Sequence, residues 1–153
     1  MRIEPLPRPE IDKFLRSQSL ARIGCHAGGQ IYIVPVSYAP EEAEGPVRSV
    51  LVHSFEGQKV RMMRENPQVC LEVDDIVNLT SWRTVVADGE FEELRGEETQ
   101  RRALWILADR LLPHTGAARA SMGDDPFRRP GLDLPAVLFR VRLRDATGRV
   151  ATP

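Results

Sequence analysis

A run of β-branched and aromatic residues with a proline inside it places the tightest limit on how this chain can fold. The run covers residues 30–38 and follows Gly28 and Gly29, and two glycines between apolar runs are a strong signal for a β-hairpin. Pro35 lies within the run, and because proline has no backbone N–H it is confined to a bulge or to an unpaired sheet edge. The sequence therefore predicts an antiparallel sheet that is irregular or open at Pro35, where a ligand or a second subunit often lies.

Similar runs elsewhere predict a protein that is mainly β with flanking helices. Strands are expected over residues 20–25, 47–53, 69–73, 82–94 and 136–143, with a bulge at Gly89 in the long one. Helical spacing of apolar residues predicts three short helices, over about 9–17, from a cap at Ser54 as far as Asn66, and over 97–112. Strands joined mainly by hairpins suit a small antiparallel barrel that is closed or partly closed.

The length and the distribution of turn-forming residues predict one domain. The 153 residues are a typical length for a single core, so residues 1–153 are expected to fold together. Residues 113–133 are rich in proline, glycine, aspartate and arginine, which predicts a long loop. Residues 146–153 are expected to form a flexible tail.

Charge balance and the absence of long apolar runs exclude several classes of function. Lys and Arg number 21 against 22 Asp and Glu, so the basic excess with which a nucleic-acid binder neutralises phosphates is missing. No run approaches the roughly 20 apolar residues of a membrane span, and the first residues lack an apolar signal core, so we expect a cytoplasmic protein. Cys25 and Cys70 have no CxxC spacing and no Cys/His cluster, which predicts buried, reduced thiols and no metal site.

The most informative segment for function is residues 53–59, HSFEGQK, where a strand is expected to give way to a helix. Amide groups at a helix start are free to donate hydrogen bonds, and the helix dipole makes that end partly positive. A lysine is slightly unfavourable there unless an anion docks on the same turn. A phosphate could be held by the side chains of Ser54, Gln58 and Lys59 and the backbone around Gly57. The alternative is an ordinary helix start, capped by Ser54, with Lys59 in solvent.

Six segments, taken in order, carry a resemblance to a known family. They are IDKFL at 11–15, LARIG at 20–24, IVPVSY at 33–38, HS and GQK within 53–59, Met63 with NPQVC at 66–70, and WRTVV at 82–86 with Gly89. In this order they resemble the FMN-binding split-barrel proteins, the pyridoxamine 5′-phosphate oxidase-like superfamily, and within it the branch named for nitroimidazole-resistance proteins. The resemblance covers residues 8–110, which is most of the chain.

The resemblance implies a six-stranded antiparallel split barrel, a homodimer, and FMN bound in grooves at the dimer interface. The residues that it implies for cofactor binding are Val34, Pro35, Val36 and Ser37 beside the isoalloxazine ring, His53, Ser54, Gly57, Gln58 and Lys59 at the ribityl phosphate, and Trp82 and Arg83 from the partner subunit. The chain departs from the family at Gln58, where a basic residue is common. An uncharged side chain there costs about 1.5–3 kcal/mol of phosphate binding relative to a cation.

His53 has two interpretations. As a strand-end histidine beside the proposed phosphate, it could donate to the phosphate, stabilise reduced flavin or transfer a proton to substrate, and the resemblance implies that it is the catalytic residue. The alternative is a packed histidine that is hydrogen-bonded to the backbone.

The function that the resemblance implies is an FMN-dependent oxidoreductase. A nicotinamide nucleotide would reduce the flavin, and reduced flavin would pass electrons to a small planar acceptor such as a nitroaromatic compound. No Rossmann glycine fingerprint is present, so the nicotinamide is expected to bind transiently. One alternative is a non-catalytic flavin- or haem-binding protein with His53 as axial ligand. Another is a pyridoxamine-phosphate oxidase, although residues 139–153 do not match the substrate-phosphate motif of those enzymes.

Overall fold

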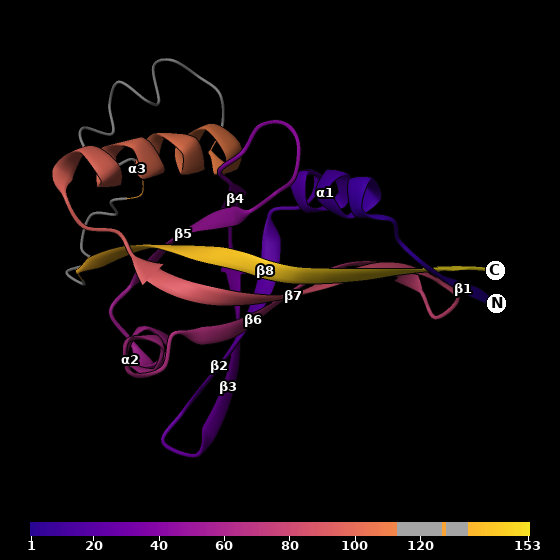
Figure 1. Ribbon diagram of the computed structural model, residues 1–153, viewed down its shortest axis with the longest axis horizontal. Coiled ribbons are helices and arrows are strands. Elements are labelled where there is room, and N and C mark those ends of the chain that lie inside the picture. The colour runs from indigo at the N-terminus through magenta and orange to yellow at the C-terminus, as the bar shows by residue number, and fades with distance from the viewer. Residues whose placement is uncertain (113–126, 128–134) are drawn as a thin grey trace.

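The computed structural model describes residues 1–112, 127 and 135–153 and shows one antiparallel sheet with helices against it (Figure 1). This confirms the prediction of a mainly β split barrel with short helices. The strands are β1 (Arg2–Pro5), β2 (Leu20–Ala27), β3 (Gln30–Ser37), β4 (Ala39–Pro40), β5 (Ser49–Phe55), β6 (Gln68–Asn78), β7 (Ser81–Glu93) and β8 (Ala136–Thr152). The helices are α1 (Arg8–Ser17), α2 (Gln58–Glu65) and α3 (Glu97–Leu111). The short strands β1 and β4 were not expected.

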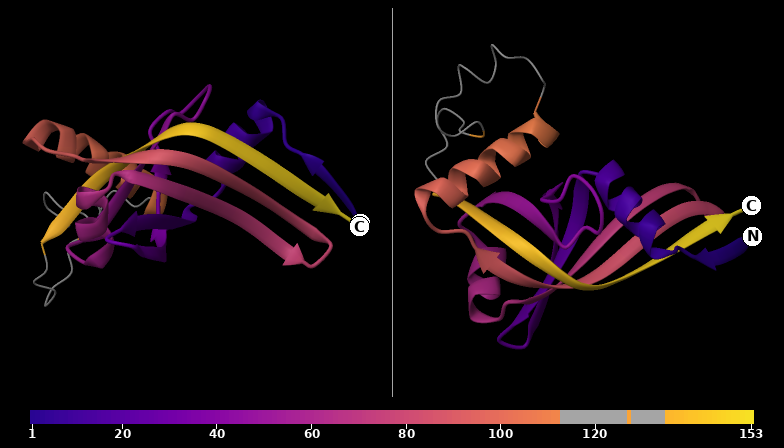
Figure 2. Two further views of the ribbon diagram at one scale, coloured as in Figure 1. Left: turned by 60° about the horizontal axis from the view of Figure 1, so that its bottom comes forward. Right: turned by 45° about the horizontal axis from the view of Figure 1, so that its top comes forward.

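The order of the strands explains why the barrel is split. They lie in the order β3-β2-β6-β7-β8-β5-β4, and β1 pairs with the end of β8. The long strands β7 and β8 curve, and the left view of Figure 2 shows this curvature most clearly. Strands β3 and β5 thereby approach each other without forming a ladder in the part of the chain that is described. We call the space between these two strands the seam.

Tyr38 is the single residue that joins the two edges of the sheet. It lies between β3, which pairs with β2, and β4, which pairs with β5. Pro35 lies on β3, which ends the strand order, so the expectation of an unpaired edge at this proline is confirmed. The predicted bulge at Gly89 is also confirmed, because the register between β7 and β8 shifts between Asp88 and Gly89.

Two apolar cores form because each strand alternates between inward and outward side chains. In β2, for example, Ala21, Ile23 and Cys25 are buried, and Arg22 between the first two is exposed. The main core fills the barrel under α1 and α2. A smaller core lies beneath α3, where Leu107 is fully buried against residues that include Leu51 and Leu138.

The prediction of a flexible tail at residues 146–153 is wrong. Residues 146–152 are the second half of β8, which pairs with both β7 and β1. Ala151 is buried, and a Cβ atom on Gly148 would lie 2.9 Å from Leu6 Cδ1, so this segment is packed rather than free. The loop predicted over residues 113–133 falls, apart from Phe127, outside the described residues.

The helices begin and end close to the predicted positions, except at the start of α2. Strand β6 differs from the prediction, because it extends five residues beyond its expected end at 73, where residues 74–78 pair with the start of β7.

Within the described residues, no helix is both long enough and apolar enough to cross a membrane.

Candidate functional site

The start of α2 differs from the prediction in a way that bears on anion binding. The predicted cap, Ser54, lies within β5 and is buried, because this strand continues to Phe55. Gly57 occupies the cap position instead, so no side chain caps the helix, and the first turn contains no acidic residue. Helix starts of this kind leave backbone N–H groups without an intrahelical acceptor, and the dipole makes them partly positive. The local electrostatics therefore favour an anion.

Lys59 lies in this first turn and is half-buried. Burial lowers the pKa of its ammonium group, and no ion pair joins Lys59 to a carboxylate in the described part of the chain. The group that would interact electrostatically with Lys59 is the Cys25 thiol, but burial raises the pKa of this thiol. Cys25 is therefore uncharged at neutral pH and leaves the lysine charge uncompensated. An anion at this turn would supply the missing counter-charge.

His53 lies on β5 and is half-buried between aromatic rings. The Phe127 ring stacks on the imidazole with 4.6 Å between centroids, and the Phe55 ring meets it edge-on at 5.4 Å. Phe55 could have been found from the sequence, since residues two apart on a strand share a face. No local signal indicates Phe127, because it comes from the segment that was predicted to be a loop.

Strand β3 places the four predicted ring-contacting residues at the seam. Val36 is buried and Val34 is half-buried against the main core, whereas Pro35 and Ser37 point outward and are exposed. Ala39 on β4 pairs with Leu51 on β5, and the two segments run antiparallel. The end of β3, which comes just before Tyr38, therefore lies toward His53 on β5. The structure thus brings together two of the predicted elements, β3 and the end of β5.

Trp82 and Arg83 lie elsewhere in the same chain. They are at the start of β7, and Figure 1 shows that the β6–β7 turn and α2 are at opposite ends of the sheet. The Arg83 guanidinium lies 5.7 Å from the centroid of the Phe14 ring on α1. Within one subunit, these two residues are therefore not part of the site formed by the seam and α2.

An exposed apolar face lies on the other side of β2 and β3. Ile31 is 79% exposed and Ile33 is 64% exposed, and both line a groove of about 520 Å³ that also includes Gly24, Cys70 and Asp88. The predicted burial of the cysteines holds for Cys25, whereas Cys70 is only half-buried on this outer face. Large apolar side chains exposed together are typical of a surface that another protein covers.

Comparison with known proteins supports this architecture over nearly the whole chain. The family model described as pyridoxamine 5′-phosphate oxidase matches residues 7–150. An uncharacterized protein of Rhizobium meliloti is 30% identical over 113 residues, which are 72% of each protein. The crystal structure of a FAD-binding protein from Mesorhizobium loti has a TM-score of 0.72 and 28% identity, and the match covers 100% of this chain and 99% of that one.

A more distant structure supports the fold alone. It comes from Bacteroides thetaiotaomicron and is described as a candidate 5-nitroimidazole antibiotic resistance protein. The TM-score is 0.66 at 16% identity, and the match covers 98% of this chain and 89% of that chain.

Proposed function

The chain belongs to the pyridoxamine 5′-phosphate oxidase family, and on that premise we propose that it binds a flavin nucleotide and uses it as an oxidoreductase. The observation that carries the proposal is Lys59, a half-buried cation without a carboxylate partner in the described residues, on the first turn of a helix that no side chain caps. The cofactor's phosphate satisfies both the charge and the free amides.

The residues on either side of the seam fit the rest of a flavin. Backbone groups of residues 34–37 lie on a strand whose outer edge is unpaired in the described residues, so they are available to a planar ring. His53 on β5 is the candidate for moving a proton or for hydrogen bonding to the ring. Bound flavin supplies the redox chemistry, and the protein orients it and excludes water. We propose a nicotinamide nucleotide as reductant and a small planar molecule, such as a nitroaromatic compound, as electron acceptor.

FMN is the cofactor that the sequence resemblance implies, and FAD is a second candidate. The Mesorhizobium loti structure that resembles this chain is that of a FAD-binding protein. An FMN phosphomonoester carries up to two negative charges, whereas each bridging phosphate of FAD carries one. Lys59 is accompanied by the uncharged Gln58, and a single cation suits a phosphate with a single charge.

A homodimer would complete the site. The exposed isoleucines on β3 provide an apolar surface for a second copy, and Trp82 and Arg83 would reach the flavin of the partner rather than their own. This arrangement accounts for their distance from α2 within one chain.

The test is the absorption spectrum of the purified protein, followed by titration with FMN and with FAD. We expect flavin absorbance or saturable quenching of added flavin fluorescence, and heat release of the cofactor identifies which flavin is bound. Lys59→Ala should weaken binding by about tenfold or more, since a charge-assisted contact is lost. Lys13→Ala, an exposed lysine on α1, is the matched control and should bind flavin normally.

Turnover is measured separately as nicotinamide oxidation in the presence of a nitroaromatic acceptor. Flavin binding without turnover would leave a flavin carrier. A protein that binds neither flavin, or a Lys59→Ala variant that binds as tightly as the wild type, would contradict the proposal.

A further inference from the structure

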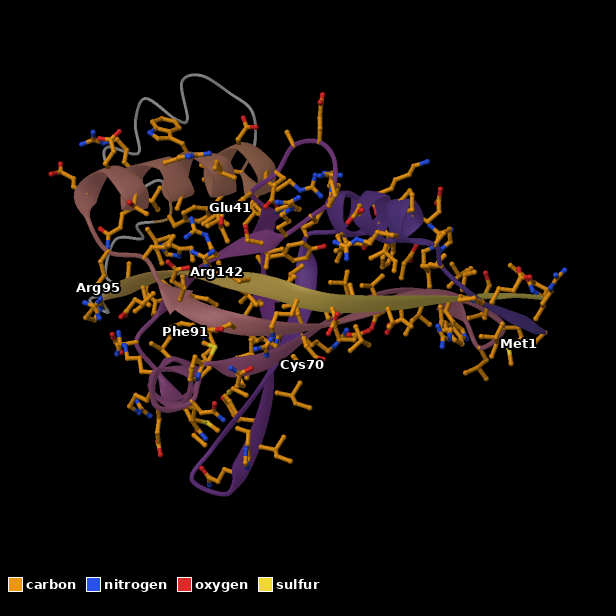
Figure 3. The ribbon with its side chains drawn as sticks, viewed as in Figure 1. Met1, Glu41, Cys70, Phe91, Arg95 and Arg142 are labelled. Carbon is orange, nitrogen blue, oxygen red and sulfur yellow. The ribbon has the colours of Figure 1, made fainter. Side chains whose placement is uncertain are left out.

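An ion-pair network lies beside the proposed phosphate site, at the end of the sheet where β7 finishes. Arg64, in the last turn of α2, donates to both carboxylate oxygens of Glu56, at 2.6 and 2.9 Å. The same guanidinium forms an ion pair with Glu93 on β7, and Arg95 donates to that carboxylate at 2.9 Å. Figure 3 shows Arg95 just beyond the end of β7, at the same end of the sheet as α2. The two carboxylates and the two guanidinium groups balance in charge.

Glu56 is the member of this network that lies nearest the helix start in sequence, because it precedes Gly57, the cap residue of α2. Negative side chains are attracted to the first turn of a helix, where the dipole is partly positive and N–H groups are free. A carboxylate there would take up the amides and the charge of Lys59 that a phosphate requires. Arg64 instead holds this carboxylate to the last turn, and its backbone is about 9 Å along the axis from the first residue of the helix.

The backbone of this region is fixed without Arg64. The backbone N–H of Glu56 donates to the Pro135 carbonyl oxygen at 3.1 Å, and β5 pairs with β8 as far as Phe55. Helix α2 is anchored separately by three buried side chains, those of Val60, Met62 and Met63. The Glu56 side chain is 35% exposed, so it has room to turn. Loss of Arg64 should therefore release this side chain without displacing the backbone around it.

We propose that Arg64 is a positioning residue for the flavin phosphate, which keeps the first turn of α2 open by holding the Glu56 carboxylate away from it. The inference rests on the proposed flavin binding and adds a restraint on which the anion site depends. Arg64 acts through Glu56 and requires no contact with the cofactor. Its second partner, Glu93, is only 16% exposed and fixes the guanidinium to the sheet.

The first experiment compares FMN affinities by quenching of flavin fluorescence. Arg64→Met should weaken binding by about three- to fivefold, the size expected when half-exposed charges rearrange. Arg64→Met/Glu56→Gln should bind FMN within about twofold of the wild type, because the competing carboxylate is gone. If Arg64 only supported folding, removal of its partner would not restore the affinity.

Two controls separate this effect from net charge. Arg64→Met/Glu93→Gln has the same net charge as the rescued variant but leaves the Glu56 carboxylate free, so FMN binding should stay weak. Arg101→Met removes one positive charge and breaks the exposed ion pair with Glu97 on α3, and it should leave the affinity unchanged.

The second experiment needs no flavin. Burial lowers the pKa of Lys59 in the wild type, and a carboxylate that turned to the first turn of α2 would raise it. NMR titration of the lysine side chain should therefore give a higher pKa in Arg64→Met than in the wild type. The rise should be absent from Arg64→Met/Glu56→Gln.

The outcomes distinguish this inference from the flavin proposal. A wild type that binds no FMN would overturn the flavin proposal and this inference with it. If the wild type binds FMN, three results would overturn the inference alone. They are unchanged FMN affinity in Arg64→Met, an equal Lys59 pKa in Arg64→Met and the wild type, and rescue by Glu93→Gln as complete as rescue by Glu56→Gln.

Discussion

The Tyr38 hydroxyl donates a hydrogen bond of 2.6 Å to the backbone carbonyl oxygen of Leu15. Both residues are fully buried. The Leu15 carbonyl lies in the last turn of α1, where carbonyl groups lack an intrahelical donor. Burial raises the pKa of the phenol, so it remains a donor throughout the physiological range. One hydrogen bond thus ties the junction between β3 and β4 to the first helix.

Removing this hydroxyl should destabilise the protein. Tyr38→Phe keeps the ring but leaves the Leu15 carbonyl buried without its donor, at a cost of about 1–3 kcal/mol in the free energy of unfolding. Urea denaturation measures the change. The matched control is Tyr32→Phe, since the hydroxyl of Tyr32 makes no hydrogen bond among the described residues. Equal stability of the two variants would contradict the structural role of Tyr38.

The ion pair between Glu41 and Arg140 predicts a loss of stability in acid. Burial opposes ionisation of Glu41, but hydrogen bonds from Arg140 and Ser49, together with the charge of Arg140, outweigh it and lower the pKa. A lowered folded-state pKa stabilises the protein above the unfolded value of 4.5, and this contribution is lost as the pH falls through the folded-state pKa. Stability should therefore decline below about pH 5.

Glu41→Gln isolates this contribution. At pH 7 it should lower the free energy of unfolding by about 2 kcal/mol, between the values for exposed and for buried pairs. The gap between variant and wild type should narrow as the pH is lowered, because protonation removes the same charge from the wild type. A gap that is constant with pH in urea titrations would show that ionisation of Glu41 is not responsible.

The bulge at Gly89 should tolerate no side chain. A Cβ atom there would lie 2.5 Å from Val141 Cγ1 and 3.0 Å from the Arg142 carbonyl oxygen, both on β8. Gly89→Ala should therefore cost about 2–3 kcal/mol of stability through overpacking. Gly24→Ala is the control, since the nearest atoms to its Cβ would be 3.8 Å away, at ordinary contact distance. Thermal denaturation of the two variants should differ clearly, and equal melting temperatures would refute the packing argument.

Restoring a second cation at α2 should strengthen flavin binding. Gln58→Arg places a guanidinium beside Lys59, and a further charge-assisted hydrogen bond should lower the Kd for FMN by about tenfold. FAD, with one charge per phosphate, should gain less. Glu98→Gln changes the net charge by the same amount on the exposed side of α3 and serves as the control. A similar gain in both variants would point to general electrostatic attraction instead.

A charge on the exposed face of β3 should prevent dimer formation. Ile33→Asp introduces a carboxylate into the apolar groove, and burying it against a second copy would cost several kcal/mol. Light scattering during size-exclusion chromatography should show a dimer for the wild type and a monomer for the variant. Because Ile33 is 64% exposed, the circular dichroism spectrum should not change. A wild-type monomer, or an intact dimer of the variant, would exclude this face as the interface.

Features set by neighbouring residues could be predicted from the sequence. The open edge at Pro35 follows from a missing N–H group, and the bulge at Gly89 was expected within a long strand. The tail could not be recognised as a strand, because residues 146–152 are held by β7 and β1, which come from distant parts of the chain. Ser54 was misplaced by the same kind of error, since pairing of β5 with β8 extends the strand through Phe55.

In the candidate site too, features set by neighbouring residues could be predicted and features set by distant segments could not. The sequence indicated Lys59 at a helix start, and the structure has it there. Contacts between distant segments, such as Phe127 on His53, had no local signal.

The one-residue link at Tyr38 limits how a flat molecule could enter between β3 and β5. Tyr38 joins β3 covalently to β4, and β4 is hydrogen-bonded to β5, so the two edges are held together at this end and can separate only at the other end. A planar ligand would therefore enter the seam at the end farthest from Tyr38, and the depth to which it inserts would be set by the point where β3 and β5 meet.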